Sequence, residues 1–344
     1  MKIYLDAMGG DHAPQATVEG AKEALGLYPE LTLELAGPAE AVTREVERAF
    51  ADAPALRERL SVTDCPEVIT NDESPVMAVR KKKNSAIVDG MLKLRDGTVD
   101  AFVSAGSTGA VLSGGMFRLG RIKGIDRPAL APLLPNGKDF FLLIDCGANV
   151  DCRPEYLAQF ALMGNAYMQG MRGIENPRIG LVNNGAESEK GCALTKATYE
   201  LLEHSNLNFV GNVEARDITN DVADVIVCDG FVGNVILKFM EGVAGTLMGI
   251  IKKEITADFR GKLGGLLAKP AFKRVKKTMD YTEVGGAPLL GVCGSVVKAH
   301  GSSNAHAIAC AIKQAVNMVQ ADVVGKIQSR LVGTETAENV APEA

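Results

Sequence analysis

The feature that most constrains this chain is a repeated order of apolar strand, glycine-containing turn and helix. The predicted strands cover residues 2–6, 31–36, 60–64, 99–104, 140–145, 178–183, 207–211, 223–228 and 292–297. Several of them are apolar on both faces, which is typical of a parallel sheet covered by helices on both sides. Helices are predicted between the strands, for example over residues 154–171 and 189–204. The pattern therefore predicts an α/β protein built on a mainly parallel sheet.

The length and charge of the chain limit how many domains it can form and what kind of partner it can bind. With 344 residues, 47% of them hydrophobic, it is long enough for one large α/β domain or two smaller ones. No internal repeat and no break in composition divides it, so we expect one domain over residues 1–331 and a flexible acidic tail over residues 332–344. The formal net charge of −5 argues against a nucleic-acid partner.

Cysteine usage and targeting signals bear on location. Seven cysteines are present, and we expect buried free thiols in a reducing cytosol. Five of them lie in apolar runs, namely Cys65, Cys146, Cys192, Cys228 and Cys310. The N-terminus lacks the basic and apolar regions of a signal peptide, and no uninterrupted apolar run is long enough to span a bilayer. We therefore expect a cytoplasmic protein.

Six loops that follow predicted strands combine glycine with small polar or charged residues. They cover residues 6–12, 104–110, 145–151, 183–191, 229–234 and 298–304. Because ligands bind beyond the carboxyl ends of parallel strands, we expect these loops to meet at one edge of the sheet. Glycines let backbone N–H groups approach a ligand, and helix N-termini favour an anion. Together the loops predict a cradle for phosphate.

Any one of these loops alone would also fit an ordinary turn, because turns use the same residues. The motifs that the chain lacks limit which kinds of ligand and reaction the loops can serve. The chain has no G-x-x-x-x-G-K-[ST], no G-x-G-x-x-G and no G-x-S-x-G, which argues against a P-loop, a dinucleotide site and a nucleophile elbow. It has no C-x-x-C pair, and His300 and His306 are six residues apart, so we expect no metal site.

A helical region late in the chain differs from this loop pattern. Residues 236–255 read as a long amphipathic helix, which would pack on the core or on a partner subunit's copy. Residues 259–279 hold seven basic residues and no acidic one, with apolar residues at multiples of four. We expect Gly264-Gly265 and Pro270 to break this segment into short pieces. The segment fits either a core-facing helix with a solvated basic face or a contact with an anionic membrane.

Together these motifs resemble the bacterial phosphate acyltransferase family, known as the PlsX family. The resemblance is carried by DAMGGDHAP, SAGSTGA, DCGANVDC, GFVGNVILK, GGAPLLGV and AHGSSNA, and it extends from Lys2 to about residue 325. It implies a three-layer α/β/α, Rossmann-like fold similar to phosphotransacetylases and to isocitrate and isopropylmalate dehydrogenases, with a helical projection at about 236–279. It also implies an acyltransferase of phospholipid (phosphatidic acid) synthesis that converts acyl-[acyl carrier protein] and inorganic phosphate to acyl phosphate and free carrier protein, without a cofactor.

The resemblance extends to site residues and partners. Lys190 and Asn234 match residues that the family is thought to use in catalysis. The phosphate and substrate site would comprise Asp6, Gly9, Gly10, His12, Ser104, Gly106, Ser107, Thr108, Gly109, Asn149, Asp229, His300, Gly301, Ser302 and Ser303. The membrane contact would comprise Leu263, Leu266, Leu267, Lys269, Phe272, Lys273 and Lys276. The family is homodimeric and touches the inner face of the cell membrane, where a glycerol-3-phosphate acyltransferase is the expected user of the product.

The expected reaction needs no catalytic triad, because the thiol of a thioester, with a pKa near ~8.5, leaves readily. Lys190 would orient phosphate, and Asn234 would donate to phosphate or to the carbonyl oxygen as charge develops. The chain has Ser107 where the family usually has Asn, and its loop NNGAESEK before Lys190 is also unusual. An acyl-CoA-dependent phosphotransacylase and a non-catalytic membrane-surface binding protein remain as alternatives.

Overall fold

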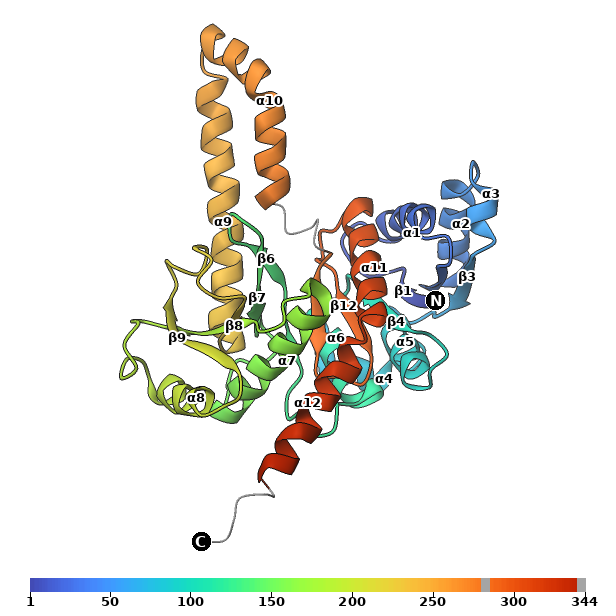
Figure 1. Cartoon of the computed structure of the whole chain (residues 1–344). Coiled ribbons are helices and arrows are strands. Elements are labelled where there is room, and N and C mark those ends of the chain that lie inside the picture. The colour runs from blue at the N-terminus through green and yellow to red at the C-terminus, as the bar shows by residue number, and fades with distance from the viewer. Residues whose placement is uncertain (280–284, 339–344) are drawn as a thin grey trace.

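The computed structural model describes residues 1–279 and 285–338 and contains two β-sheets (Figure 1). The larger sheet has seven strands in the order β3-β2-β1-β4-β12-β11-β5. Their bounds are β1 (Lys2–Asp6), β2 (Thr32–Gly37), β3 (Leu60–Asp64), β4 (Ala101–Ser104), β5 (Ala129–Leu130), β11 (Ala287–Leu290) and β12 (Ser295–Lys298). Strands β3, β2, β1, β4 and β12 run parallel, whereas β11 is antiparallel to both β12 and β5.

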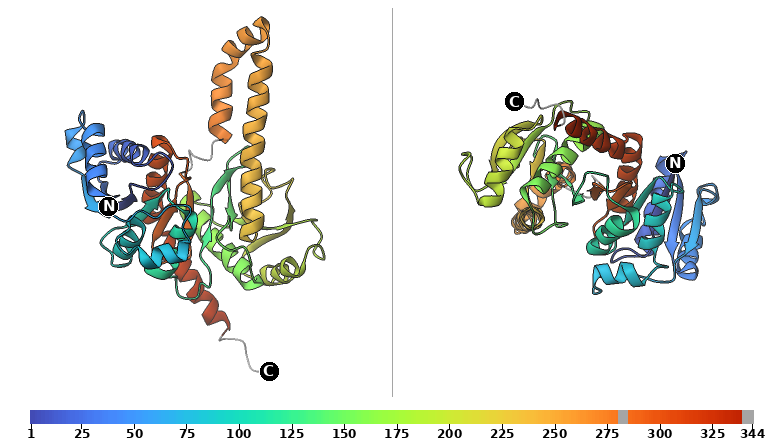
Figure 2. Two further views of the ribbon diagram at one scale, coloured as in Figure 1. Left: turned by 180° about the vertical axis from the view of Figure 1, so that it is seen from behind. Right: turned by 90° about the horizontal axis from the view of Figure 1, so that it is seen from below.

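The second sheet has five strands in the order β6-β7-β10-β8-β9. Their bounds are β6 (Leu133–Pro135), β7 (Phe140–Ile144), β8 (Arg178–Asn183), β9 (Asn208–Glu214) and β10 (Val225–Val227). All pairings are parallel except that of β6 with β7. Seen from below, the two sheets lie in separate halves of the molecule (Figure 2).

Helices alternate with the strands along the chain, as the sequence predicted. They are α1 (Gln15–Leu27), α2 (Ala39–Ala49), α3 (Pro54–Arg57), α4 (Pro75–Lys81), α5 (Ala86–Arg95), α6 (Thr108–Gly114) with the π-helical turn η1 (Gly115–Leu119), α7 (Pro154–Arg172), α8 (Ala193–Glu203), α9 (Gly230–Ile255), α10 (Phe259–Met279), α11 (Ala305–Gln320) and α12 (Val323–Glu338). Helix α12 continues through Glu338, into the segment expected to be a tail, and the rest of that segment lies outside the described residues.

Alternating side chains of each sheet pack into layers of helices on opposite faces. Ile3 in β1 packs with Val18 of α1 in one buried cluster, whereas the next residue, Tyr4, packs with Met91 of α5 in another. In the second sheet, Leu142 of β7 joins the first cluster, together with α7, and Phe141 joins the second, together with the base of α9. Each cluster therefore contains residues of both sheets, and the two halves share a continuous interior.

The expected fold class, a mainly parallel α/β architecture in three layers, is confirmed, but the expectation of one sheet was wrong. The strands divide between two sheets, and the six predicted loops divide with them, three following β1, β4 and β12 and three following β7, β8 and β10. The short strands β5, β6 and β11 were not predicted. They span two to four residues, and both β6 and β11 contain proline, so they give no clear period of two.

Helices α9 and α10 form a hairpin that projects away from both sheets (Figures 1 and 2). Contrary to the sequence-based expectation, α10 is one continuous helix with Pro270 inside it. Gly261 and Gly265 let α10 lie close to the end of α9, because Cβ atoms at these positions would approach Ile255 to 2.5 and 2.4 Å. Within the described residues, α9 is the one helix long and apolar enough to cross a membrane by length and composition, and the apolar stretch that meets this criterion contains no fully buried residue.

The cysteine expectation holds only in part. Cys65, Cys146, Cys228 and Cys310 are buried free thiols, as expected, whereas Cys152 is half-buried, Cys293 is exposed, and so is Cys192. It lies at the N-cap of α8, in the loop after β8, because α8 begins at Ala193 and the expected helical run before it is loop.

Candidate active site

A cavity of about 440 Å³ lies where loops from the two sheets meet. Four predicted site residues line it: Thr108 after β4, Asn234 near the start of α9, and His300 and Gly301 after β12. The other lining residues include Cys146 and Gly147 after β7, Lys238 and Glu241 on α9, and Lys298 at the end of β12. The predicted convergence therefore occurs for four of the six loops, those after β4, β7, β10 and β12, and it joins two sheet edges instead of one. The loops after β1 and β8 contribute no lining residue.

Asp6 and Ser104 join the loops after β1 and β4 to each other. The Ser104 hydroxyl donates to Asp6 Oδ2 over 2.7 Å and accepts from the backbone N–H of Gly106 over 3.0 Å. Met8 N–H donates to Asp6 Oδ1 over 3.2 Å. Both side chains are buried, and burial raises the pKa of the Asp6 carboxyl despite these donors. Asp6 and Ser104 therefore stabilise the two loops, and their polar groups already have hydrogen-bond partners.

The glycines after β1 serve loop packing. A Cβ on Gly9 would lie 2.6 Å from Gly106 N, and one on Gly10, where φ is +100°, would lie 2.9 Å from Gly301 O. Asp11 N–H donates to Gly301 O over 2.8 Å, which joins this loop to the loop after β12. The sequence analysis assigned these glycines to ligand contact, whereas here they bring three loops together.

Asp145 organises the loop after β7. It is fully buried, and its carboxylate accepts from the N–H groups of Leu130 (2.9 Å), Ala148 (3.3 Å) and Asn149 (2.7 Å). The Asn149 amide donates to Asp145 Oδ2 over 2.9 Å and to Pro128 O over 2.8 Å. Burial raises the pKa of Asp145 to about 6. Asn149, predicted to bind substrate, thus has its amide hydrogens engaged in holding the loop.

Asn234 lies in the first turns of α9 and faces the cavity. Asp229, also a predicted site residue, caps this helix by accepting from Val232 N–H over 2.9 Å. Within the described residues, the Asn234 side chain has no protein hydrogen-bond partner, and the closest atoms around Gly147 include its Cβ and Oδ1. Its amide is therefore available for a ligand.

His300 brings a further polar group to the cavity. Ser302 N–H donates to His300 Nδ1 over 3.2 Å, and the Ser302 hydroxyl lies 2.8 Å from the same nitrogen. His300 Nε2 lies 3.4 Å from Nζ of Lys238, which is itself paired with Glu241 at 2.7 Å. Burial lowers the pKa of His300, so the ring is neutral at neutral pH. Ser303 is buried, and its N–H donates to His300 O over 3.1 Å.

Several other predicted residues lie outside the cavity lining. His12 is exposed at the turn before α1. Ser107 occupies the N-cap position of α6 without a side-chain capping bond, and a Cβ on Gly109 would lie 2.5 Å from Pro75, which shows a packing role for that glycine. Lys190 is exposed in the loop after β8, where its backbone carbonyl accepts from the Asn183 amide over 3.1 Å.

Lys298 lies in the predicted loop 298–304 but is one of several lining residues, with Cys146, Gly147, Lys238 and Glu241, that the sequence analysis did not name as site residues. It is the last residue of the apolar strand β12 and is buried, yet it lines the cavity. Its Nζ donates to the carbonyl oxygens of Ala105, at 3.4 Å, and Ala299. The available signal was a lysine ending an otherwise apolar strand, SVVK, directly before the AHGSSNA motif.

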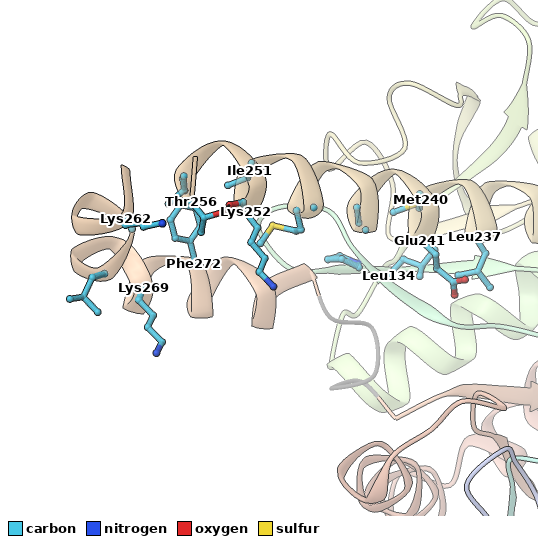
Figure 3. Close-up of a pocket in the computed structure, with 18 residues that line it drawn as sticks. Leu134, Leu237, Met240, Glu241, Ile251, Lys252, Thr256, Lys262, Lys269 and Phe272 are labelled. Atoms are coloured by element: carbon cyan, nitrogen blue, oxygen red, sulfur yellow. Dashed lines mark hydrogen bonds between the residues drawn. The ribbon is translucent and has the colours of Figure 1, made fainter. Parts of the chain in front are cut away.

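An apolar groove of about 910 Å³ runs between α9 and α10 and adjoins the cavity (Figure 3). The two hollows share Leu237 and Glu241. From there the groove follows α9 past Met240 and Ile251 to Ile255, with Phe272 of α10 on the opposite wall (Figure 3). Leu237 to Ile255 spans about 27 Å at the ~1.5 Å rise of an α-helix. The hairpin thus carries an apolar path from the polar cavity toward its tip.

The predicted membrane residues of α10 and the apolar residues of α9 each divide into a set that lines this groove and a set that does not. Leu266, Lys269 and Phe272 line the groove, whereas Leu263 and Leu267 do not; all three leucines are largely exposed, at 66%, 53% and 77% for Leu266, Leu263 and Leu267. Lys273 and Lys276 lie in α10, but their side chains are outside the described part. On α9, Met240, Ile251 and Ile255 line the groove, whereas the exposed apolar side chains outside it include Phe239, Val243, Leu247 and Ile250.

Known proteins share this sequence and architecture. The chain matches the family described as "Fatty acid synthesis protein" over residues 1–326. It is 48% identical over 336 residues to a phosphate acyltransferase of Clostridium tetani, covering 98% of this chain and 99% of that protein. It is 50% identical over 331 residues to a phosphate acyltransferase of Thermoanaerobacter pseudethanolicus, covering 96% and 97%.

Two solved structures share the fold at low sequence identity. A phosphotransacetylase from Streptococcus pyogenes superposes with a TM-score of 0.60 at 18% identity, covering 94% of both chains. A branched-chain phosphotransacylase from Enterococcus faecalis gives a TM-score of 0.58 at 13% identity, covering 93% of this chain and 99% of that chain. The fold is therefore one that phosphotransacylases also have. From its sequence, the chain belongs to the phosphate acyltransferase (PlsX) family, and it is an acyltransferase.

Proposed function

We propose that this enzyme transfers a long acyl chain from the thioester of acyl carrier protein to inorganic phosphate, releasing acyl phosphate. The relatives named phosphate acyltransferase support phosphate as the acceptor. The observation that carries the proposal is the continuity of a polar cavity, lined by Asn234, Lys298 and His300, with an apolar groove. Such a pair of hollows suits a substrate with a reactive polar end and a long hydrocarbon tail.

The groove has room for a membrane-length acyl chain. A bilayer core of about 30 Å contains two leaflets, so one chain needs about 15 Å. The stretch of α9 from Leu237 to Ile255 is longer than that, at about 27 Å. Its walls are mainly apolar, whereas the charged Glu241 stands where the groove meets the cavity. The thioester carbonyl would therefore lie near Glu241 and Asn234 when the tail occupies the groove.

In the proposed reaction, a phosphate oxygen attacks the thioester carbonyl carbon. A C–O bond forms, the C–S bond breaks, the carrier-protein thiolate leaves, and the proton of hydrogen phosphate passes to that thiolate. Asn234 supplies an amide N–H to the oxygen on which charge develops, which suits its unpaired side chain. Lys190 would reach phosphate from the exposed loop after β8, beside the strand that precedes Asn234.

The choice of donor distinguishes this proposal from its nearest alternative, a coenzyme A-dependent phosphotransacylase. Initial rates with palmitoyl-[acyl carrier protein] and palmitoyl-CoA, at equal concentrations and the same phosphate concentration, test it. We expect the carrier-protein thioester to react at least tenfold faster. A preference for palmitoyl-CoA would favour the alternative, and binding of vesicles without turnover of either donor would favour a non-catalytic membrane-surface protein.

We further propose that the enzyme acts as a homodimer at the inner face of the cell membrane, within phospholipid synthesis. The apolar face of α9 formed by Phe239, Val243, Leu247 and Ile250 is exposed and supports pairing with a second copy. The exposed leucines of α10, beside its basic residues, support a peripheral contact with anionic lipid. A membrane acyltransferase would then receive the product with a short path through water.

A further inference from the structure

We propose that Lys298 binds the phosphate acceptor inside the cavity, as a cationic ligand distinct from Lys190. This inference rests on the proposed function for the identity of the acceptor, but not for the existence of an anion site. It assigns a role to a side chain that the sequence motifs did not single out. The reasons are its position, its burial and the lack of a charged partner.

Lys298 is a buried residue of the cavity wall. It ends β12, the strand beside β4, and is 8% exposed. Its backbone is therefore fixed within the seven-stranded sheet, and its Nζ donates to Ala105 O over 3.4 Å and to Ala299 O. An ammonium group has three hydrogens, so a third donor remains for a ligand in the cavity that Lys298 lines.

The buried ammonium lacks a carboxylate partner. Within the described chain, Lys298 forms no ion pair with a carboxylate, unlike Lys93, whose Nζ lies 2.5 Å from Glu34 Oε1. The nearby carboxylate of Asp6 accepts from Ser104 and Met8 instead. A buried unpaired charge is costly, and an anion entering the cavity would offset that cost. Burial lowers the pKa of Lys298 to about 8, which still leaves the ammonium form in excess at neutral pH.

Of the basic groups near the cavity, Lys298 is the one best suited to bind an anion. Lys238 is paired with Glu241, and His300 is neutral at neutral pH. Lys190 is exposed and outside the cavity lining. The titratable groups that face Lys298 or share its cavity are Asp6, Asp11, Lys238, Glu241, His300 and Cys146. In the proposed reaction, Lys298 holds the non-attacking phosphate oxygens and stays protonated throughout.

Anion binding to the full-length protein tests the inference without any acyl donor. The probes are inorganic phosphate and sulfate, and the readouts are the rise in thermal midpoint and calorimetric affinity. We expect Lys298→Met to weaken the binding of both anions at least tenfold. The control is Lys326→Met, which removes a half-buried ammonium group that donates to a carbonyl oxygen and should keep wild-type anion affinity. Equal affinity in Lys298→Met and wild type, or no phosphate binding by the wild type, would overturn the inference.

The wild-type protein gives a second test that does not depend on the folding of a variant. Sulfate keeps its charge between pH 7 and pH 9, whereas a lysine with a pKa of about 8 passes from mainly charged to mainly neutral. Sulfate affinity should therefore fall about tenfold over this range, as the protonated fraction does. The same fall in Lys298→Met would assign it to other groups and overturn the inference. If anion binding depends on Lys298 but no acyl phosphate forms, the proposed function fails while the anion site stands.

Discussion

Gly233 lies so close to the backbone carbonyl of Asp145 that a Cβ on it would be 1.9 Å from the carbonyl oxygen. The first turn of α9 therefore packs directly against the loop after β7. Asn234, the next residue, and Gly147, two residues after Asp145, face each other across this contact. The close approach of Gly233 and Asp145 therefore sets the position of the amide that the reaction needs.

This contact predicts a large stability difference between two glycine substitutions in the same helix. Gly233→Ala must displace backbone atoms, so we expect it to lower the free energy of unfolding by about 1–3 kcal/mol. Gly242→Ala has open space around its Cβ and should raise it by roughly 0.5–1 kcal/mol, because alanine favours a helix over glycine. Urea unfolding of both variants measures the difference, and equal stabilities would refute the tight contact.

The groove predicts that its volume limits the length of the acyl chain. Gly249 lines the groove, and a Cβ there would meet no atom within 4 Å. Gly249→Leu should therefore fold normally while filling the acyl path. We expect kcat/KM for palmitoyl-[acyl carrier protein] to fall at least tenfold relative to that for the decanoyl donor. Gly242→Leu, on the same helix but outside the groove, is the matched control, and an unchanged chain-length ratio in Gly249→Leu would place the acyl chain elsewhere.

Asn234→Ala should reduce kcat by ~10²–10³, as expected for loss of one donor to a developing oxyanion. The fold should be retained, because the Asn234 side chain has no hydrogen-bond partner in the described protein. Steady-state kinetics with saturating donor and phosphate measure the effect. Val235→Ala, an exposed neighbour outside the cavity lining, should keep wild-type turnover. Near-normal turnover in Asn234→Ala would remove that amide from the reaction.

Lys190→Ala should lower the rate at least tenfold, about 1.4 kcal/mol of barrier, if the loop after β8 brings this lysine to phosphate during turnover. Because Lys190 is exposed, its loss should leave the thermal midpoint unchanged. The kinetic comparison with Lys298→Met separates the two lysines. Full activity in Lys190→Ala would leave Lys298 as the cation that serves phosphate.

The sequence was informative about the strands, the loops and the helical hairpin, but not about their partition into two sheets. Apolar runs such as residues 140–144 identify a buried strand, yet nothing in them says which strand lies beside it. Gly9 and Gly10 were identified as part of a loop after a strand, but their contacts with Gly106 and Gly301 depend on tertiary packing. Lys298 was missed because a lysine at the end of a strand usually reaches solvent, and only the packed structure shows its burial.

The exposed leucines of α10 predict binding to anionic vesicles that weakens with added salt. Leu263→Glu with Leu267→Glu should abolish this binding, because both side chains are largely exposed and carboxylates would be repelled by the lipid headgroups. Turnover with soluble donor should stay near normal, since neither residue lines the groove. The control carries Leu27→Glu with Leu201→Glu, at exposed leucines of the α/β body. Vesicle flotation of the α10 variant at wild-type level would place the membrane contact elsewhere.

The central claim is that phosphate bound in the cavity attacks the thioester of an acyl donor whose hydrocarbon tail lies in the groove. The most direct test incubates the purified protein with palmitoyl-[acyl carrier protein] and labelled inorganic phosphate and follows label in the lipid-soluble fraction. We predict one palmitoyl phosphate formed for each carrier-protein thiol released. Release of thiol and free fatty acid without label in the lipid, or no reaction of the thioester at all, would contradict it.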